Sequence, residues 1–306
     1  MPTYLEELTL RLARGIDRIG EPLRARHAVF LKAAQRDDGG FAGREGPSDL
    51  YYTGFALRGL ALVGELDGEP ARRAAQFLKG RLSGQAPIVD FLSLLYGAAL
   101  LQNSAGIDIF ADAPAGWREA VAETLERFRR PDGGYAKTHD GQSSSTYHTF
   151  LFVLANQLIG RPPREPQRLV EFVRSRQRDD GGFVEIGPMR KSGTNPTAAA
   201  VGLLKILDAL DEGTRQTTID FLAGMQGDEG GLTANTRIPL ADVLSTFTGA
   251  LTLGDLAANG EIDRAAARRF VESMELAGGG FRGGAWDEGT DVEYTFYGLA
   301  ALAILG

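Results

Sequence analysis

The sequence contains no cysteine among its 306 residues. This absence excludes disulfide bonds, thiolate nucleophiles, iron–sulfur clusters and every zinc site that uses a thiolate ligand. Histidine is also scarce, with three residues in the whole chain. One histidine beside scattered carboxylates is a weak metal signal, and no metal site is predicted from composition.

Basic residues are outnumbered by acidic ones, 33 to 40, which gives a formal net charge of -7. A nucleic-acid-binding protein needs a basic face, so this class is excluded, and no polybasic segment suits an anionic membrane. The first 20 residues lack the continuous apolar core of a signal peptide. The longest apolar stretches, such as residues 297–305, are about half a membrane span. We therefore expect a soluble, cytoplasmic protein without a membrane span.

Glycine is abundant, at 40 residues, and it is periodic. The second glycines of five double-glycine turns are Gly40, Gly134, Gly182, Gly231 and Gly280. Their gaps are 94, 48, 49 and 49 residues, and the first gap equals two periods of 47. A degenerate unit with Gly84 in its turn is expected in that gap. After an N-terminal helix at about residues 1–20, six units fill the chain from near His27, and residues 1–306 form one domain.

Each unit combines an amphipathic helix, a double-glycine turn, a polar loop and a second helix that is apolar nearly all round. An amphipathic helix covers a core, whereas an apolar one is buried. Six such pairs predict an all-α double ring, the (α/α)6 toroid, with apolar inner helices around a central cavity. The starts of the inner helices line one mouth of that cavity, where binding residues are expected.

A threonine recurs near the start of the apolar helices: Thr53, Thr149, Thr197, Thr246 and Thr295. Four residues before these threonines stand Asp49, Ser145, Gly193, Asp242 and Asp291. Four of those five residues are of types that cap helix N-termini well, so capping is one interpretation of this position.

The segment Phe30–Phe41 has the pattern FLxxxQxxxGGF. It resembles the repeat signature shared by squalene and terpene cyclases and the β subunits of protein prenyltransferases. The segments 228–247 and 290–306 are similar to the last two repeats of the β subunit of Rab geranylgeranyltransferase. The resemblance implies an α/α toroid whose apolar cavity holds an isoprenoid. In that family zinc, held by Asp, Cys and His, activates an acceptor thiolate, and basic residues hold the diphosphate.

Carried over by position, the zinc ligands of this family are only partly present. Asp242 occupies the aspartate position, but Leu244 replaces the cysteine and Tyr294 replaces the histidine. We therefore predict that the protein binds neither zinc nor another cofactor. Magnesium is expected only if a diphosphate is bound. Arg237 is the only cation near Asp242, since the family's basic residues are displaced.

The start of the last apolar helix also resembles the Asp-x-Asp-Asp-Thr motif of class II terpene cyclases. Here the motif reads Asp-Val-Glu-Tyr-Thr from Asp291, with Glu293 at the position of the acid that protonates an alkene. Burial in an apolar cavity helps a carboxylic acid to keep its proton. Asp242, Asp291 and Glu293 are therefore the candidate catalytic residues, with capping and helix-dipole stabilisation as the alternative.

The candidate substrate-binding residues fall into two groups. An aromatic group at the inner-helix starts suits an isoprenoid or a carbocation, or else packs at the rim with hydrated polar tips; it comprises Tyr51, Tyr52, Tyr147, His148 and Tyr294. A cationic group could bind a diphosphate, or else consists of solvated loop charges; it comprises Arg190, Lys191 and Arg237.

Three hypotheses remain open. The chain is an enzyme that acts on a prenyl diphosphate without zinc, a cyclase that uses Glu293 and Asp291, or a lipid-binding or scaffold toroid without chemistry. The expected ligand is an isoprenoid or another long apolar molecule. A helical partner subunit or a homo-oligomer is compatible with the sequence.

Overall fold

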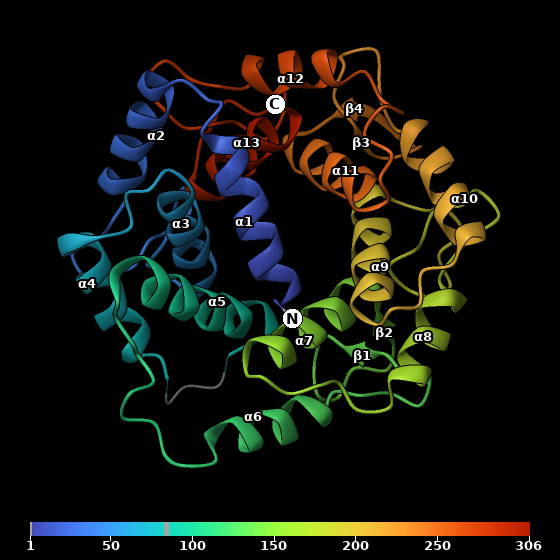
Figure 1. The fold of residues 1–306 in the computed structure, drawn as a ribbon, viewed down its shortest axis with the longest axis horizontal. Coiled ribbons are helices and arrows are strands. Elements are labelled where there is room, and N and C mark those ends of the chain that lie inside the picture. The colour runs from blue at the N-terminus through green and yellow to red at the C-terminus, as the bar shows by residue number, and fades with distance from the viewer. Residues whose placement is uncertain (1, 83–85) are drawn as a thin grey trace.

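The computed structural model describes residues 2–82 and 86–306, which form a closed ring of helices (Figure 1). In these residues, six helices line the ring: α3 (Leu50–Leu62), α5 (Ile88–Ala105), α7 (Thr146–Leu158), α9 (Thr194–Ile206), α11 (Val243–Asp255) and α13 (Val292–Leu305). Six more cover it: α2 (Glu21–Ala33), α4 (Gly68–Lys79), α6 (Trp117–Glu126), α8 (Pro166–Ser175), α10 (Glu212–Ala223) and α12 (Arg264–Ser273). The all-α toroid is confirmed, while the turn expected at Gly84 lies outside the described residues.

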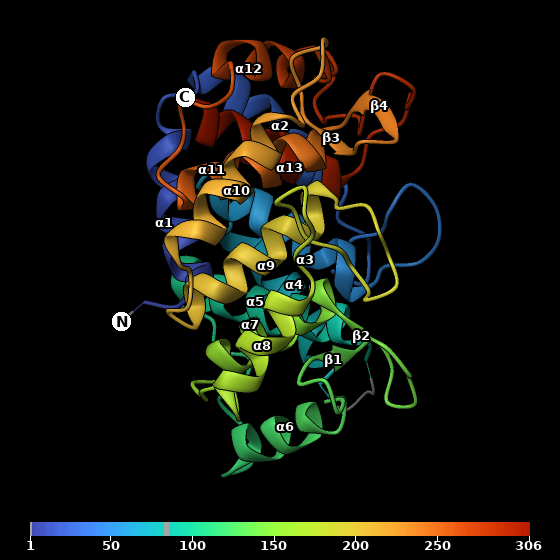
Figure 2. The ribbon, with the colours of Figure 1, turned by 90° about the vertical axis from the view of Figure 1, so that its right-hand side faces the viewer.

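Two small antiparallel ribbons, which the sequence did not predict, interrupt the loops before α7 and α11. They are formed by β1 (Tyr135–Ala136) with β2 (Ser144–Ser145), and by β3 (Thr233–Asn235) with β4 (Ile238–Ala241). Figure 2 shows both on the same side of the ring, where the inner helices begin.

The double-glycine turns fix each unit to the next. The first glycine of each of the five turns has φ between 85° and 92°, a conformation that only glycine adopts without strain. The second glycine lies against an aromatic ring of the following outer helix. At Gly134, for example, a Cβ atom would come within 2.4 Å of the Phe172 ring. Glycine is thus required at both positions, for different reasons.

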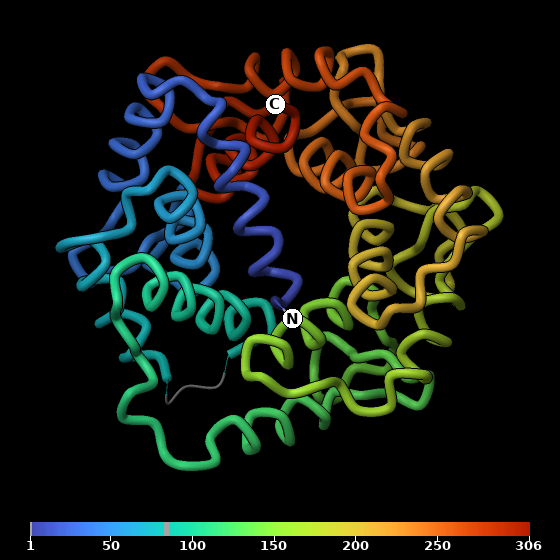
Figure 3. Tube along the Cα trace, viewed as in Figure 1, coloured from blue at the N-terminus to red at the C-terminus, as the bar shows by residue number. Residues whose placement is uncertain are grey.

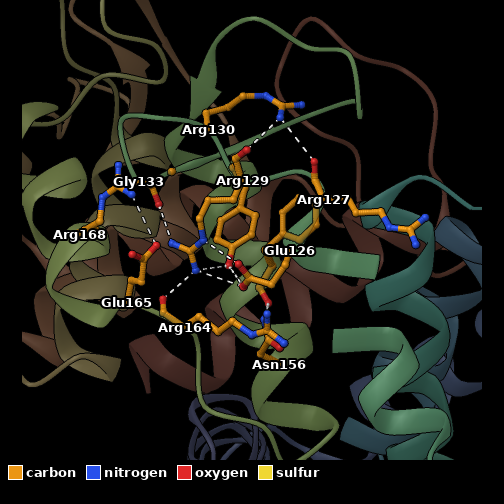
Figure 4. A network of polar contacts seen from close by, with 12 residues as sticks. Glu126, Arg127, Arg129, Arg130, Gly133, Asn156, Arg164, Glu165 and Arg168 are labelled. Atoms are coloured by element: carbon orange, nitrogen blue, oxygen red, sulfur yellow. Dashed lines mark hydrogen bonds and ion pairs between the residues drawn. The ribbon is translucent and has the colours of Figure 1, made fainter. Parts of the chain in front are cut away.

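In four of these five turns, a polar side chain four residues before the first glycine binds the turn. The glutamine amide donates to the carbonyl of that glycine at 2.8–3.2 Å in the turns of Gln35, Gln177 and Gln226. Arg129 takes this place in the third unit and donates to the carbonyls of Gly133 and Arg164 at 3.2 and 2.7 Å (Figure 4). Its guanidinium is also paired with Glu126 at 2.7 Å. This network joins neighbouring units on the outside of the ring.

The recurrent threonines and caps hold the inner helices. The Thr149 hydroxyl accepts the backbone N–H of Tyr135 at 2.9 Å and donates to the carbonyl of Ser145 at 2.6 Å. The side chains of four predicted caps accept the N–H three residues later; these are Asp49, Ser145, Asp242 and Asp291. The capping interpretation is confirmed for these four, and Gly193 makes no such bond.

The ring closes between the last unit and the first. The backbone N–H of Gly280 donates to Nδ1 of His27 at 3.1 Å, and the His27 ring stacks on Phe281 at 4.7 Å. Since His27 lies on α2, this contact joins the sixth turn to the first outer helix (Figure 3).

The N-terminal helix α1 (Tyr4–Ile16) crosses the inside of the ring in Figure 1. The Tyr4 hydroxyl donates to Asp255 at 2.9 Å, and Arg11 pairs with the same carboxylate at 3.1 Å. Gly15 packs against the backbone of Ala303. Asp255 and Ala303 lie near the ends of α11 and α13, so α1 covers the C-terminal ends of the inner helices.

One helix in the described part of the chain, α5, is long and apolar enough to cross a membrane. It is an inner helix, and more than half of it is buried. Packing within the ring accounts for its apolar composition.

Candidate functional site

A cavity of about 490 Å³ lies between the six inner helices and α1. Its volume is within the range of small-molecule binding pockets. The residue two positions after each inner-helix cap lines it, and we call these the first layer: Tyr51, Val89, Tyr147, Asn195, Leu244 and Glu293. The second layer lies six positions after each cap: Phe55, Ser93, Leu151, Ala199, Thr248 and Tyr297. The third layer lies nine positions after: Arg58, Tyr96, Leu154 and Leu251.

These spacings of four and three residues place one stripe of each helix on the cavity wall. Residues at the cap itself point elsewhere, as do those three positions after it except Pro196 on α9, because each residue turns the helix by about 100°. The repeat therefore decides which side chains can reach a central ligand.

The third-layer end of the cavity is closed by α1, through Tyr4, Leu5 and Leu8. The hydroxyls of Thr9 and Tyr96 share a hydrogen bond of 2.5 Å that ties α1 to α5. The helix expected at residues 1–20 thus forms the floor of the cavity, a role that the sequence did not indicate.

Among the described residues, nine aromatic rings line the wall, together with aliphatic side chains. The Tyr297 ring lies 5.1 Å from that of Phe55 and 5.7 Å from that of Phe247, between centroids. Such faces pack well against an apolar chain, and they also attract a positive charge. The wall can therefore accommodate an apolar ligand and can stabilise a positive charge.

Glu293 is the only one of the three candidate acids that lines the cavity. Its Oε1 accepts a hydrogen bond of 2.6 Å from the Tyr51 hydroxyl. Burial raises the pKa of Glu293 above its usual value; the Tyr51 hydrogen bond and the Arg58 charge oppose this rise. A protonated Glu293 carboxyl group would therefore face a ligand bound in the cavity.

Arg58 is the one cation on the wall among the described residues. Its guanidinium lies 4.7 Å from the centroid of the Phe55 ring and 4.9 Å from that of Tyr96. Its buried Nε atom has no hydrogen-bond partner within residues 2–82 and 86–306. Arg58 was not predicted from the sequence, although a charge in the otherwise apolar segment 50–62 was a visible signal.

Asp242 and Asp291 lie outside the cavity lining. Asp242 accepts from the backbone N–H and the hydroxyl of Ser245 at 2.6 and 2.8 Å, and burial raises its pKa. Asp291 accepts from the Tyr294 N–H at 2.9 Å and from Arg44 Nε at 3.2 Å. The structure shows both carboxylates as helix caps.

The five candidate aromatic and imidazole residues divide by position. Tyr51 and Tyr147 belong to the first layer, whereas Tyr52, His148 and Tyr294 lie one residue further on and do not line the cavity. The Tyr52 and Tyr294 rings instead fill the space beside glycines of the preceding loops.

His148 contacts polar groups near the mouth of the cavity. Its Nδ1 atom lies 2.7 Å from the Ser145 hydroxyl, which also donates to Glu185. Glu185 lines the cavity and was not predicted from the sequence, because it lies in a loop.

The candidate cations of the loops are not brought together at the cavity. Arg190 and Lys191 are exposed before α9, and Arg237 is exposed between β3 and β4. None of them belongs to the cavity lining.

The donor set at the family's zinc position does not fit zinc. Asp242 is engaged by Ser245, Leu244 has no donor atom, and Tyr294 supplies only a phenol, whose pKa burial raises to about 12. Throughout the described residues, no group of three or more His, Asp and Glu side chains could hold a metal ion.

Comparisons with known proteins agree with this architecture. Residues 23–90 and 99–306 match the family model of the prenyltransferase alpha-alpha toroid domain. No curated protein sequence matches the chain.

Solved structures share the fold at low sequence identity. Candida albicans protein geranylgeranyltransferase-I complexed with GGPP is 17% identical, with a TM-score of 0.74 over 92% of this chain and 91% of that one. A type II terpene cyclase from Scytonema in complex with geranylgeranyl dihydroxybenzoate is 14% identical, with a TM-score of 0.63 over 98% of both chains. A glycosidase is 13% identical, with a TM-score of 0.62 over 97% and 96%. Identities this low establish the fold, which hosts several chemistries.

Proposed function

Because the chain belongs to the prenyltransferase alpha-alpha toroid domain family, we propose that its central cavity binds an isoprenoid chain. The three-layered lining of aromatic and aliphatic side chains is the observation that carries this proposal. Two of the structural neighbours are complexed with geranylgeranyl compounds, which supports the choice of ligand. The closer likeness to the β subunit of Rab geranylgeranyltransferase stays a prediction, as do a partner subunit and a cytoplasmic location.

The proposed function does not use zinc. Of the three family ligands only Asp242 is retained, and its carboxylate caps α11. A diphosphate, if the ligand carries one at the mouth of the cavity, would have to recruit the exposed Arg190, Lys191 and Arg237 from their loops. Removal of these three charges should then weaken binding of a prenyl diphosphate and spare binding of the matching alcohol.

Binding is tested by calorimetry with geranylgeraniol, a neutral isoprenoid. Ala198 lines the cavity on α9, so Ala198→Trp should fill part of it and abolish or strongly weaken binding. Ala120→Trp makes the same change on the exposed face of α6 and serves as the matched control. Equal binding by the two variants, or no binding by the native protein, would refute the proposal.

A second candidate function is proton-initiated cyclisation, which the placement of Glu293 favours. The Glu293 carboxylic acid would give its proton to a terminal carbon–carbon double bond, forming a C–H bond and leaving a tertiary carbocation and a carboxylate. The next double bond would attack that cation and form a C–C bond, while the aromatic wall stabilises the positive charge. Loss of a proton from the final cation to water would end the sequence, and a second water-borne proton would restore the acid.

This function ranks second, because Tyr294 replaces the last acid of the cyclase motif. Incubation with geranylgeranyl substrates and analysis by gas chromatography–mass spectrometry tests it. Glu293→Gln should abolish cyclic products and keep geranylgeraniol binding. A native protein that binds but forms no product would favour the non-catalytic toroid.

A further inference from the structure

Arg58 is placed in the cavity by the helical stripe of α3. Tyr51, Phe55 and Arg58 follow one another at i, i+4 and i+7, so all three side chains lie on the same wall. Phe55, Tyr96 and Phe296 surround the guanidinium, with ring centroids 4.7, 4.9 and 6.0 Å away. The charge is therefore held in position by aromatic faces.

This cation has no ion-pair partner in the part of the chain that the structure describes. Two other arginines that contact the inner helices do have ion-pair partners: Arg11 pairs with Asp255 at 3.1 Å, and Arg44 pairs with Asp287 at 2.5 Å. The described residues give Arg58 neither an ion pair nor a hydrogen bond at its buried Nε. A charge in an apolar cavity is costly unless it is paired, and ring faces compensate only part of the cost.

The two ends of the cavity differ in their ionisable side chains. Glu185 and Glu293 line the end where the inner helices begin, and Arg58 lies in the third layer beside α1. Seven residues separate Tyr51, which holds Glu293, from Arg58, and this corresponds to about 10 Å along a helix. The carboxyl groups at the first layer offer no positive charge to an anion, whereas Arg58 attracts one at the third layer.

We propose that Arg58 binds an anionic group of the ligand, a carboxylate or a phosphate, so that the isoprenoid lies with its charged end against α1 and its apolar end toward Glu293. This inference rests on the proposed function and adds the chemical class and the orientation of the ligand. Guanidinium is suited to both anions, because it donates two parallel hydrogen bonds to either.

The test measures binding of three probes with the same chain: geranylgeraniol, geranylgeranoic acid and geranylgeranyl monophosphate. The native protein should bind at least one anionic probe about ten- to a hundredfold more tightly than the alcohol, as charge-assisted hydrogen bonds allow. Comparison of the acid with the monophosphate identifies which anion fits. Arg58→Met should remove this preference and keep binding of the alcohol.

Two further variants make the test decisive. Arg58→Lys keeps the charge without the planar fork and should retain part of the preference, even if Arg58→Met does not fold. Arg269→Met removes an exposed charge from α12 and should keep the native preference. If Arg58→Met binds the alcohol and still prefers the anion by the native factor, the inference is wrong. If the native protein binds none of the probes, the proposed function itself fails.

Discussion

Thr149→Val tests whether the recurrent threonine holds the inner helices. Valine has nearly the shape of threonine, so the substitution removes the hydroxyl with little change of packing. Thr149 is fully buried, and its hydroxyl accepts the Tyr135 N–H at 2.9 Å and donates to the Ser145 carbonyl at 2.6 Å. The change leaves a buried N–H without a partner, which costs about 1–3 kcal/mol.

The assay is thermal unfolding followed by circular dichroism. Each kcal/mol corresponds to roughly 2–4 °C in a protein of this size class, so Tm should fall by several degrees. Thr124→Val is the matched control, because within the described residues its hydroxyl bonds only to the carbonyl of Ala120, on the exposed face of α6. That variant should stay within about 0.5 kcal/mol of the native protein. Equal Tm shifts for the two variants would refute the assigned role of the threonine.

Three further predictions concern the turns, the acid and the floor of the cavity. Gly134→Ala should destabilise the fold by about 1–3 kcal/mol in denaturant unfolding, since its Cβ would meet Phe172, whereas Gly260→Ala has open space and should be neutral. The pKa of Glu293 is raised on folding from its ordinary 4.5, so its contribution to stability is present below that pH and is lost as pH rises through the folded pKa. The stability of the native protein relative to Glu293→Gln, measured by urea unfolding across pH 4–8, should therefore fall as pH rises; a flat difference would contradict the assignment. Leu8→Trp should fill the α1 end of the cavity and weaken binding of geranylgeraniol more than that of the shorter geraniol; an equal loss for both would place the ligand elsewhere.

The fold was predictable because its determinants repeat. The turn needs a glycine with positive φ, such as Gly133, and the helix start needs a threonine that bonds to the turn, such as Thr149. The same residue types therefore recur at the same positions of the repeat. The position of α1 could not be predicted from the repeat. It depends on single long-range contacts, such as that between Tyr4 and Asp255, which do not recur along the sequence.

The cavity was harder to predict than the ring. Glu293 and Tyr51 were chosen as candidates for their residue types, and both do line the cavity. Asp291 and Tyr294 were chosen on the same grounds. They lie two residues before and one residue after Glu293, and the helical rotation over that distance turns their side chains away from the cavity. Side-chain direction follows the helical stripe, and the stripe could be assigned only once the caps were located. Arg58 lies on that stripe, two turns below Tyr51.

The most direct test of an isoprenoid in the central cavity is photo-crosslinking with a geranylgeranyl probe that carries a diazirine on its chain. Peptide mass spectrometry then locates the label. If the isoprenoid binds in the cavity, labelled peptides from α3, α11 and α13 will contain Phe55, Phe247 or Phe296, and excess geranylgeraniol will suppress the labelling. Label confined to the outer helices, or label that geranylgeraniol does not displace, would contradict it.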